Sequence, residues 1–396
     1  MDVLTGLQEL FVVALVSALA PLVAALIPHQ RVPQVVLLLL GGMLIGPSGL
    51  GIDSTQELEL VANVGLGFVF LLAGFEIDPA LLLSRSGKLA VVAWVVALLA
   101  AVGVVGVLAA IGYVEAFVPV ALALTTSALG TVLPILREKG MLGGTFGRYF
   151  LASGAAGELF PILAIAIFLG VDSSLAAILS IAAIAVIGLV LASAPRVLRG
   201  GRLHQLVAEG ADTTGQTTIR WSILLLIALL VLAGEFGLDV VLGAFLAGVV
   251  LRHWTPGGAH AFESKLDAIG YGFFIPVFFV VAGMAVDLGS ILDAPARVGV
   301  FLVLLLLVRG VPVLFVYRRA LAFRRRSQLM FCTATTLPLV VALTQIGLEN
   351  GTMLPENGAA LVGAGVLSVL LFPLVAVLLD RSEAPEPDVG STPVST

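Results

Sequence analysis

Two charged residues lie in the middle of long apolar segments, one an acid and the other a base. Among 20 Lys and Arg and 25 Asp and Glu residues, only Glu158 and Arg309 are placed in this way. A charge at mid-membrane depth costs several kcal/mol on most scales, so it indicates a functional site. The chemistry open to this pair is reversible binding of a proton or a cation by the carboxylate. The arginine stays charged at any relevant pH.

Glu158 follows a run of small residues and precedes a proline. The run is Ala-Ser-Gly-Ala-Ala-Gly at positions 152–157, and Pro161 follows. Small residues let another helix approach closely and leave room for an ion and water. Burial disfavours the ionised carboxylate, whereas a nearby cation favours it. A carboxylate balanced in this way can exchange a proton for a metal cation near neutral pH, each occupant excluding the other.

Arg309 leaves two interpretations open. It could form a structural ion pair with Glu158, with no ion bound there. It could instead act as a charge partner for an ion-binding carboxylate, or as a structural pin elsewhere. Gly310 and Pro312 follow it, so its helix is locally perturbed. Four other acids end or begin apolar segments, where solvated caps are commoner than ligands: Glu76, Asp78, Asp239 and Asp287.

Polar and helix-breaking residues concentrate in two further apolar segments. The first contains Thr125, Thr126, Ser127, Gly130, Thr131 and Pro134. The second contains Thr333, Thr335, Thr336, Pro338, Thr344 and Gln345. Broken helices survive in a bilayer only where protein or a watery cavity satisfies the freed backbone groups. Two broken spans in corresponding positions indicate a transporter's binding site. Each segment alone could be a simple kink, because Ser and Thr bond back onto their own backbone.

Composition places these residues in a membrane. The chain has 396 residues, of which 60% are hydrophobic and 11% charged, against about 25% charged in a soluble domain. Its apolar blocks are near the length that spans a bilayer, which predicts an all-α polytopic membrane protein. We expect about thirteen spans, at residues 8–27, 32–50, 57–75, 88–111, 115–136, 147–169, 173–195, 219–234, 237–252, 267–285, 298–317, 327–347 and 357–379.

The basic residues predict the orientation of these spans. All but two of the 20 Lys and Arg residues fall in one alternating set of connections, and the exceptions are Arg297 and Arg309. Positive charge stays cytoplasmic, so we expect a multi-pass protein of the cell (inner or plasma) membrane with its N-terminus outside. Residues 1–380 form the predicted transmembrane domain, and residues 381–396, rich in Pro, Ser and Glu, a disordered cytoplasmic tail.

Several stretches along the chain carry a family resemblance. They are Arg31-Val-Pro-Gln-Val-Val with Gly41 to Gly51, Phe70 to Asp78, Leu133 to Gly140, Leu242 to Gly248, and Pro276 to Asp287. In this order the chain resembles the monovalent cation:proton antiporters, in particular the Kef-type membrane subunit and its sodium/proton exchanger relatives. The resemblance implies inverted repeats, two discontinuous crossing helices, an elevator-like motion of a core domain against an interleaved dimerisation domain, and a homodimer.

The resemblance also assigns roles to residues. The family's essential acid lies in the sixth helix, usually an Asp preceded by Asn, Asp or Gln, and here that position reads Gly157-Glu158. Glu158 is therefore the expected carboxylate for H⁺ and for Na⁺ or K⁺. The expected polar neighbours are Thr125, Thr126, Ser127 and Ser153, with Thr335 and Thr336 on the crossing helix. Arg309 falls in the helix where relatives place a basic residue.

The resulting hypothesis is a secondary-active antiporter that exchanges Na⁺ or K⁺ for H⁺ and needs no cofactor and no nucleic acid. Gly157 supplies no side-chain ligand, so a single titrating carboxylate predicts one-for-one, electroneutral exchange. Two rivals stay open: a symporter or uniporter of an organic solute on a related fold, and a non-transporting sensor or assembly module. An enzyme is disfavoured because no nucleophile–base or metal set is evident.

Overall fold

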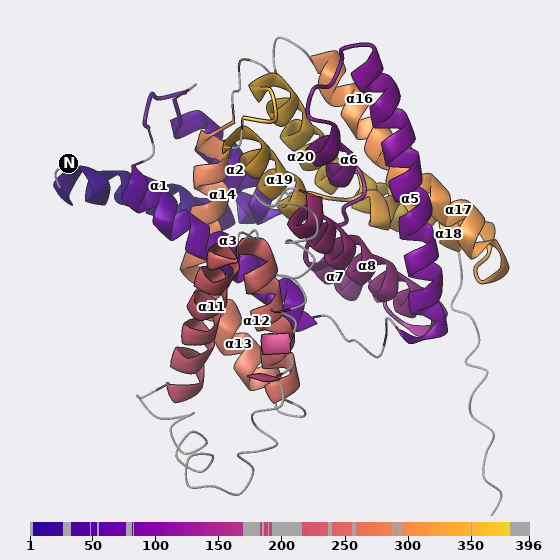
Figure 1. Cartoon of the computed structure of the whole chain (residues 1–396), viewed down its shortest axis with the longest axis horizontal. Helices are drawn as coiled ribbons and strands as arrows, with labels where there is room; N and C mark the ends of the chain where they lie inside the picture. Colours follow the sequence, from indigo (N-terminus) through magenta and orange to yellow (C-terminus); the bar gives the residue numbers. More distant parts are fainter. Residues whose placement is uncertain are drawn as a thin grey trace, which may run out of the picture.

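The computed structural model describes most of the chain as helices. The described residues are 3–26, 33–47, 49–53, 55–76, 81, 83–168, 183, 186–188, 190–191, 216–236, 240–255, 259–286, 289, 291, 295–349 and 351–380. Within these residues there is no β-strand (Figure 1). The tail predicted at residues 381–396 lies outside them.

Most helices match the predicted spans one to one. They are α1 (Val3–Leu26), α2 (Gln34–Ile45), α3 (Gln56–Glu76), α5 (Arg85–Ala110), α8 (Gly144–Phe168), α11 (Thr217–Glu235), α12 (Val240–Trp254) and α20 (Pro355–Leu378). By length and composition, 8 helical stretches in the described part of the chain could cross a membrane. This set differs from the helices just given, since α2 and α12 are shorter apolar helices. The prediction of an all-α polytopic membrane protein is confirmed. The seventh predicted span, 173–195, lies mostly outside the described residues, so the number thirteen stays a prediction.

Two predicted spans are each divided into two helices by an unwound stretch. The fifth consists of α6 (Phe117–Ala123) and α7 (Leu129–Glu138), and the twelfth of α18 (Phe323–Ala334) and α19 (Pro338–Glu349). Both breaks fall where the Ser, Thr and Pro residues concentrate in the sequence. The predicted discontinuities of these two spans are therefore present in the structure.

The tenth and eleventh spans contain π-helical turns. The tenth runs through α13 (Ala259–Ile269), η2 (Gly270–Phe274) and α14 (Ile275–Met284). The eleventh runs through α16 (Pro295–Leu305), η3 (Leu306–Gly310), α17 (Val311–Val316) and the 3₁₀ turn η4 (Tyr317–Arg319). Each π-helical turn directly precedes a helix with proline at its second position, Pro276 or Pro312. Because proline has no N–H to donate, the regular hydrogen-bond ladder is interrupted there.

The helices pack as two groups that alternate along the chain. The first group consists of α1, α2, α3, α11, α12, α13, η2 and α14, and the second of α5 to α8 and α16 to α20 (Figure 1). Within the first group α3 and α12 cross closely, because each has a glycine at the contact. A Cβ at Gly74 would lie 2.1 Å from the Phe245 carbonyl oxygen, and one at Gly248 would lie 2.0 Å from the Leu71 carbonyl oxygen. Backbone-to-backbone contact of this kind is how membrane helices gain packing without a hydrophobic driving force.

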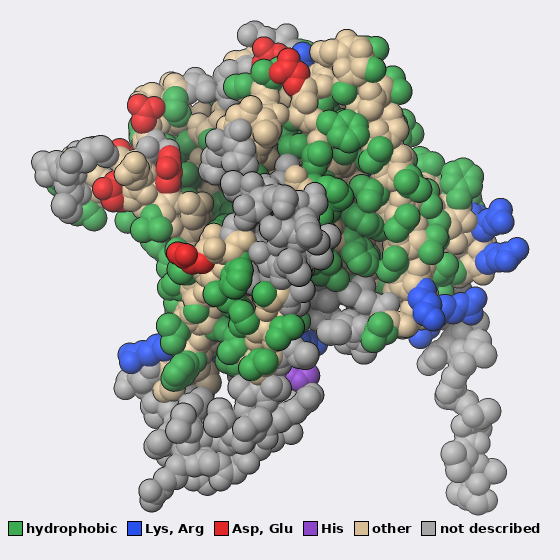
Figure 2. Space-filling model, viewed as in Figure 1, with side chains coloured by type: hydrophobic (Ala, Val, Ile, Leu, Met, Phe, Trp, Pro, Cys, Tyr) green, Lys and Arg blue, Asp and Glu red, His purple; other side chains and the backbone are tan. Residues whose placement is uncertain are grey.

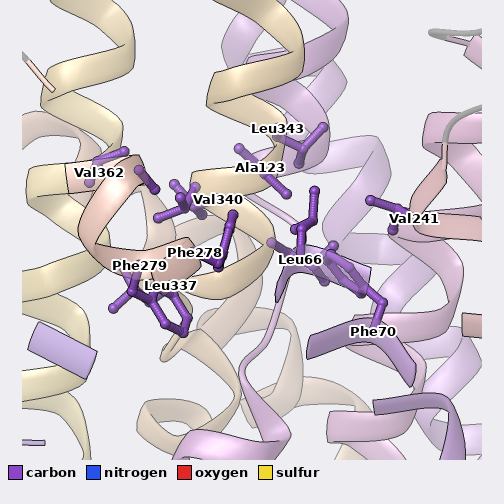
Figure 3. Packing of buried hydrophobic residues seen from close by; sticks show 14 of the residues in the cluster. Leu66, Phe70, Ala123, Val241, Phe278, Phe279, Leu337, Val340, Leu343 and Val362 are labelled. Carbon is purple, nitrogen blue, oxygen red and sulfur yellow. The ribbon is translucent and has the colours of Figure 1, made fainter. Parts of the chain in front are cut away.

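The two groups meet through apolar side chains. Buried residues of both groups belong to one continuous cluster. Figure 3 shows part of it, where side chains of α3, α12 and α14 lie with those of the second group: Leu66, Phe70, Val241, Phe278, Phe279, Ala123, Leu337, Val340, Leu343 and Val362. The side chains labelled there are apolar, so they form no hydrogen bond between the two groups.

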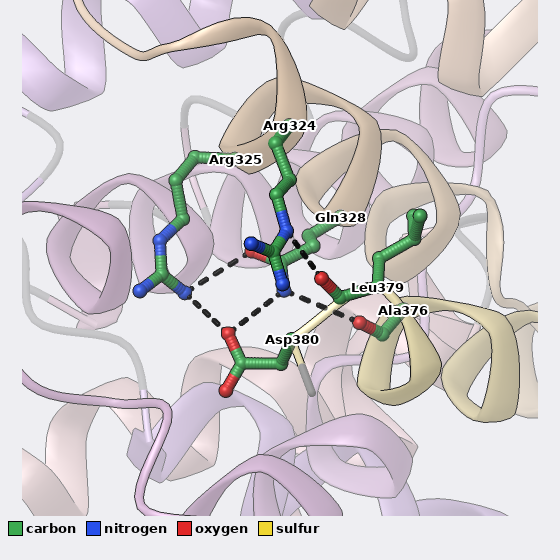
Figure 4. Close-up of polar contacts among 6 residues, drawn as sticks. All are labelled: Arg324, Arg325, Gln328, Ala376, Leu379 and Asp380. Carbon is green, nitrogen blue, oxygen red and sulfur yellow. Dashed lines mark hydrogen bonds and ion pairs between the residues drawn. The ribbon is translucent and has the colours of Figure 1, made fainter. Parts of the chain in front are cut away.

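A polar cluster ties the start of α18 to the end of α20 (Figure 4). Arg325 Nη1 donates to Asp380 Oδ1 at 2.8 Å, and Gln328 Nε2 donates to the same oxygen at 3.0 Å. Arg324 Nε donates to the carbonyl oxygen of Leu379, one of the terminal carbonyls that lack a partner within their own helix. We call Arg324, Arg325, Gln328 and Asp380 the α18–α20 latch.

Charged side chains separate by sign on the surface. In the face shown in Figure 2, Asp and Glu lie towards the upper left, most Lys and Arg lie towards the lower edge and the right, and hydrophobic side chains occupy the area between. A band of apolar surface between two polar ends is what a bilayer requires of a protein that spans it.

Candidate functional site

The two unwound stretches contact each other in the second group of helices. The Ala128 backbone N–H donates to the Thr335 carbonyl oxygen at 2.8 Å. The Ser127 hydroxyl donates to the Thr333 carbonyl oxygen at 2.6 Å. The hydroxyls of Thr126 and Thr336 lie 2.6 Å apart. Each break thus supplies partners for backbone groups that the other leaves free, as a helix interruption at membrane depth requires.

Local sequence explains why the helices end here. The hydroxyls of Thr125 and Thr126 donate back to the carbonyl oxygens of Leu122 and Ala123, at 2.8 and 2.7 Å. These bonds compete with continuation of the α6 backbone ladder. On the other side α19 begins at Pro338, a residue that suits the first helical turn because its missing N–H would be unpaired there anyway.

Ser368 of α20 supports the second break, and no sequence signal singled it out. Its hydroxyl donates to the Thr336 carbonyl oxygen at 2.8 Å and accepts the Thr336 backbone N–H at 3.1 Å. Ser368 is fully buried. A lone serine in an apolar span is common, so only the packing of α20 against the break shows its role.

Glu158 lies against the start of α7. Glu158 is part of α8, and 7% of its surface is exposed. Its Oε1 accepts the backbone N–H of Leu129, the first residue of α7, at 2.7 Å. The positive end of a helix dipole favours a negative charge at this position. Its Oε2 is buried and has no hydrogen-bond partner among the residues that the structure describes. One carboxylate oxygen is therefore held in place while the other is free to take a proton or a cation.

Arg309 is fully buried but does not pair with Glu158. Its Nε donates to the Ser127 hydroxyl at 3.0 Å, and its Nη2 donates to the Ser153 carbonyl oxygen at 2.8 Å. No ion pair within 4.0 Å joins it to Glu158, both residues being in the described part. The guanidinium thus connects the α6–α7 break to α8. The direct ion pair with Glu158 is therefore not made between these two described residues, and the structural pin and the charge partner acting without direct contact both stay predictions.

Gly157 is a glycine because its neighbours fill the space of a side chain. A Cβ at this position would lie 2.4 Å from the Ser127 hydroxyl oxygen and 2.6 Å from Arg309 Nη2. The Gly157 carbonyl oxygen also accepts the Ser127 backbone N–H at 3.0 Å. The guanidinium and the Ser127 hydroxyl therefore occupy the space that a side chain at position 157 would need.

The other predicted site residues have different partners. Thr335 bonds back to the Phe331 carbonyl oxygen at 3.0 Å, as Thr125 does within its own segment. The Ser153 hydroxyl lies 2.6 Å from the hydroxyl of Tyr317, a fully buried residue of η4 that the sequence reasoning missed. The structure thus brings Ser127 and Ser153 together around Arg309, and Thr126 and Thr336 together at the crossing.

Glu76 brings a second carboxylate to the start of α7. It is the last residue of α3. Its Oε2 is buried and has no hydrogen-bond partner in the described part of the chain. This oxygen lies 4.0 Å from the Cβ position of Gly130, the residue that follows Leu129. Glu76 as a whole is half-buried, so a solvated cap describes at most its other carboxylate oxygen. Asp78, Asp239 and Asp287 lie outside the described residues.

Comparison with known proteins adds family and fold. The model of the family described as "Sodium/hydrogen exchanger, transmembrane" matches residues 12–378. The "Putative Na(+)/H(+) antiporter YjbQ" of Bacillus subtilis is 29% identical over 96% of this chain, which spans 64% of that protein's length. The "Probable Na(+)/H(+) antiporter 3" of Methanocaldococcus jannaschii is 25% identical over 92% of this chain and 95% of that protein.

A solved structure has the same fold. The sodium proton antiporter MjNhaP1 from Methanocaldococcus jannaschii superposes with a TM-score of 0.66 at 19% identity, covering 96% of this chain and 99% of that one. The family resemblance and the antiporter-like fold predicted from the sequence are thereby confirmed.

Proposed function

The chain belongs to the sodium/hydrogen exchanger family, and on that basis we propose that it is a secondary-active antiporter exchanging Na⁺ or K⁺ for H⁺. The observation that carries the proposal is the geometry of Glu158. One of its oxygens is fixed by the Leu129 backbone N–H, and the other is buried and unpartnered among the described residues. A buried anion needs a counter-charge or a proton, and either occupant would satisfy the free oxygen.

The exchange rests on competition for this one carboxylate. When Glu158 is ionised, the start of α7 stabilises its charge and a cation can bind the free oxygen. When it is protonated, the free oxygen carries the proton and the cation is released. Both loaded forms of the carboxylate are neutral, so the proposed stoichiometry is one cation for one proton, with no net charge moved.

Glu76 is proposed to pass cations between Glu158 and the cytoplasm. In the proposed orientation α3 ends on the cytoplasmic side, so its last residue lies between the interior of the cell and the start of α7. Two carboxylates beside one helix end, each with a buried oxygen, disfavour the state in which both are ionised and empty. An arriving cation would relieve that repulsion, which favours its transfer to Glu158.

Alternating access is proposed to come from movement of the second group of helices, which carries Glu158, against the first. The apolar contact in Figure 3 supports this because it has no fixed polar partners to break. The first group would then form the stationary part of a homodimer. The distribution of basic residues supports an outside N-terminus and a cytoplasmic C-terminus.

The test uses purified protein in liposomes that enclose a pH-sensitive dye. An imposed proton gradient is followed by addition of Na⁺ or K⁺, and cation-driven loss of the gradient reports exchange. We expect activity in the wild type and none in Glu158→Gln. Glu356→Gln is the matched control, because the Glu356 side chain is 61% exposed and pairs with Arg297 at 2.7 Å on the surface.

Three outcomes would reject parts of this proposal. Wild-type exchange by a correctly folded Glu158→Gln variant would reject the site. A current that follows the membrane potential during exchange would reject the one-for-one stoichiometry. Uptake of an organic solute without cation-dependent proton movement would reject antiport and favour a solute carrier.

A further inference from the structure

A cleft opens on the outside of the second group, between α5 and the α17–η4 segment. Its volume is about 600 Å³. Four basic side chains line it, and all four are exposed: Arg85, Lys88, Arg318 and Arg319. No acidic residue of the described chain is among its lining, and these four residues form no ion pair with any described acid. Among the described residues, therefore, no acid offsets the positive charge of the cleft.

The rest of the lining is apolar, and three of its side chains are exposed. Val92 is 50% exposed, Val96 41% and Phe315 66%. Pro312 also lines the cleft. The cleft thus has a cationic end and an apolar wall. A site for a free inorganic anion would need the cationic end but not the apolar wall.

The depth of the cleft matches one leaflet of a bilayer. The basic residues lie where membrane-crossing stretches begin and end, at Arg85 and at Arg319. Along α5 the lining then extends from Arg85 to Val96, a rise of roughly 16 Å at 1.5 Å per residue. The hydrocarbon core of a bilayer is about 30 Å thick, so the apolar wall extends to about its middle. Positive charge at the membrane surface above an apolar wall of leaflet depth is complementary to an anionic phospholipid.

A second hollow adjoins the cationic end. Its volume is about 260 Å³, and it shares Arg85 with the cleft. Arg148 and the hydroxyl-bearing residues Ser84, Ser86 and Tyr149 complete its lining. Arg148 next to the cationic end offers further donors to the outer oxygens of a phosphodiester headgroup, whereas the Ser84 hydroxyl already donates to the Leu81 carbonyl oxygen.

We propose that this cleft binds one anionic phospholipid of the cytoplasmic leaflet, with its phosphate among the four basic residues and an acyl chain along α5. The assignment to that leaflet rests on the proposed orientation, but the binding itself does not depend on transport. Both walls belong to the group of helices that carries Glu158. Pro312 of the wall is three residues from Arg309, so the lipid would contact the helical span that carries this arginine.

Native mass spectrometry of the delipidated, detergent-solubilised full chain tests the proposal. The probes are dioleoylphosphatidylglycerol, dioleoylphosphatidylcholine and inorganic phosphate. We expect one tightly bound phosphatidylglycerol per chain, weaker binding of the zwitterionic lipid and no retained phosphate. Equal retention of both lipids, or phosphate binding that competes with phosphatidylglycerol, would overturn it.

Charge variants locate the site. Each basic residue near an anionic headgroup contributes roughly fivefold to affinity, so the double variant Arg318→Gln/Arg319→Gln should bind phosphatidylglycerol about 25-fold more weakly. The matched control is Lys139→Gln/Arg220→Gln, which removes two exposed charges that do not line the cleft. An equal loss in this control would show a general surface-charge effect and overturn the site.

A variant of the apolar wall gives an independent answer should the charge variant fail to fold. Val96→Trp fills the cleft, whereas Val95→Trp places the same side chain at a neighbouring position that is 42% exposed and outside the cleft. We expect Val96→Trp to lose phosphatidylglycerol binding and Val95→Trp to keep it. Retention of the lipid by both variants would overturn the acyl-chain assignment.

Discussion

The substitution Glu158→Asp tests the hydrogen bond that fixes the carboxylate. It keeps the charge but shortens the side chain by one C–C bond, about 1.5 Å. The Oε1 to Leu129 N distance of 2.7 Å would lengthen to about 4 Å, beyond hydrogen-bonding range. The ionised carboxylate would then lose a charge-assisted bond worth about 1.5–3 kcal/mol.

The sign of the effect follows from which form the bond stabilises. The Leu129 N–H donates, so it stabilises the ionised carboxylate more than the protonated one. Without it the protonated form persists to higher pH. At about 1.4 kcal/mol per pH unit, the acidic limb of the activity profile should move up by about one to two units. Exchange measured in liposomes over a series of equal internal and external pH values gives this limb directly.

The control is Glu356→Asp, which shortens an exposed glutamate and should leave the profile unchanged. Melting temperatures of both variants show whether the fold is kept. A Glu158→Asp profile that is unchanged, or that moves to lower pH, would refute the role given to the Leu129 N–H. A lower melting temperature with an unmoved profile would show that the bond is structural only.

Three further predictions concern stability, read from thermal unfolding of the purified protein. Ser127→Ala removes the hydroxyl that accepts from the Arg309 guanidinium and donates across the two breaks, so it should lower the free energy of unfolding by about 3 kcal/mol. The control Ser222→Ala loses only a bond to its own helix and should lower it by under about 1 kcal/mol. Equal losses would contradict the structural role given to Arg309. Gly248→Val should lower the melting temperature strongly, because the added side chain would collide with the α3 backbone. The control Gly103→Val should change it little, because nothing lies within 4 Å of a Cβ at that position. Similar melting temperatures for the two variants would count against the close crossing of α3 and α12. Asp380→Asn weakens the α18–α20 latch, in which the side chains of Arg325 and Asp380 are each 34% exposed. We therefore expect the free energy of unfolding to fall by about 1 kcal/mol or less. A much larger loss would contradict the interpretation of the latch as a surface contact between two helix ends.

The sequence alone located the acid, the base and both helix breaks. Glu158 and Arg309 can be identified from the sequence because a charge in the middle of a membrane span is rare. It is rare because placing a charge at that depth costs several kcal/mol. The breaks are visible because Thr, Ser and Pro each weaken the helical ladder through local chemistry. These signals depend on a residue and its near neighbours in the chain, so one sequence is enough to find them.

The partners of these residues could not be found in the same way. The distance between Arg309 and Glu158 depends on how η3, α8 and the α6–α7 break pack, and no local pattern specifies that packing. Ser368 and Tyr317 gain their roles only from helices far away in the chain. Glu76 looked like an interfacial cap because the end of a span normally faces water, but the start of α7 lies beside it. The single-carboxylate argument rested on Gly157 alone, and the stoichiometry stays a prediction.

The contact between Gly157 and the Arg309 guanidinium also makes these two positions epistatic. Introducing Asn or Asp at position 157 would place a Cβ atom 2.6 Å from Nη2 and 2.4 Å from the Ser127 oxygen, so that single change should be destabilising. Shortening residue 309 alone would leave a void and remove the guanidinium donors from the Ser127 hydroxyl and the Ser153 carbonyl oxygen. We therefore expect the effects of the two changes not to add, because each alters the space that the other residue needs. The melting temperature and exchange activity of the double variant, compared with those of each single variant, would measure this coupling.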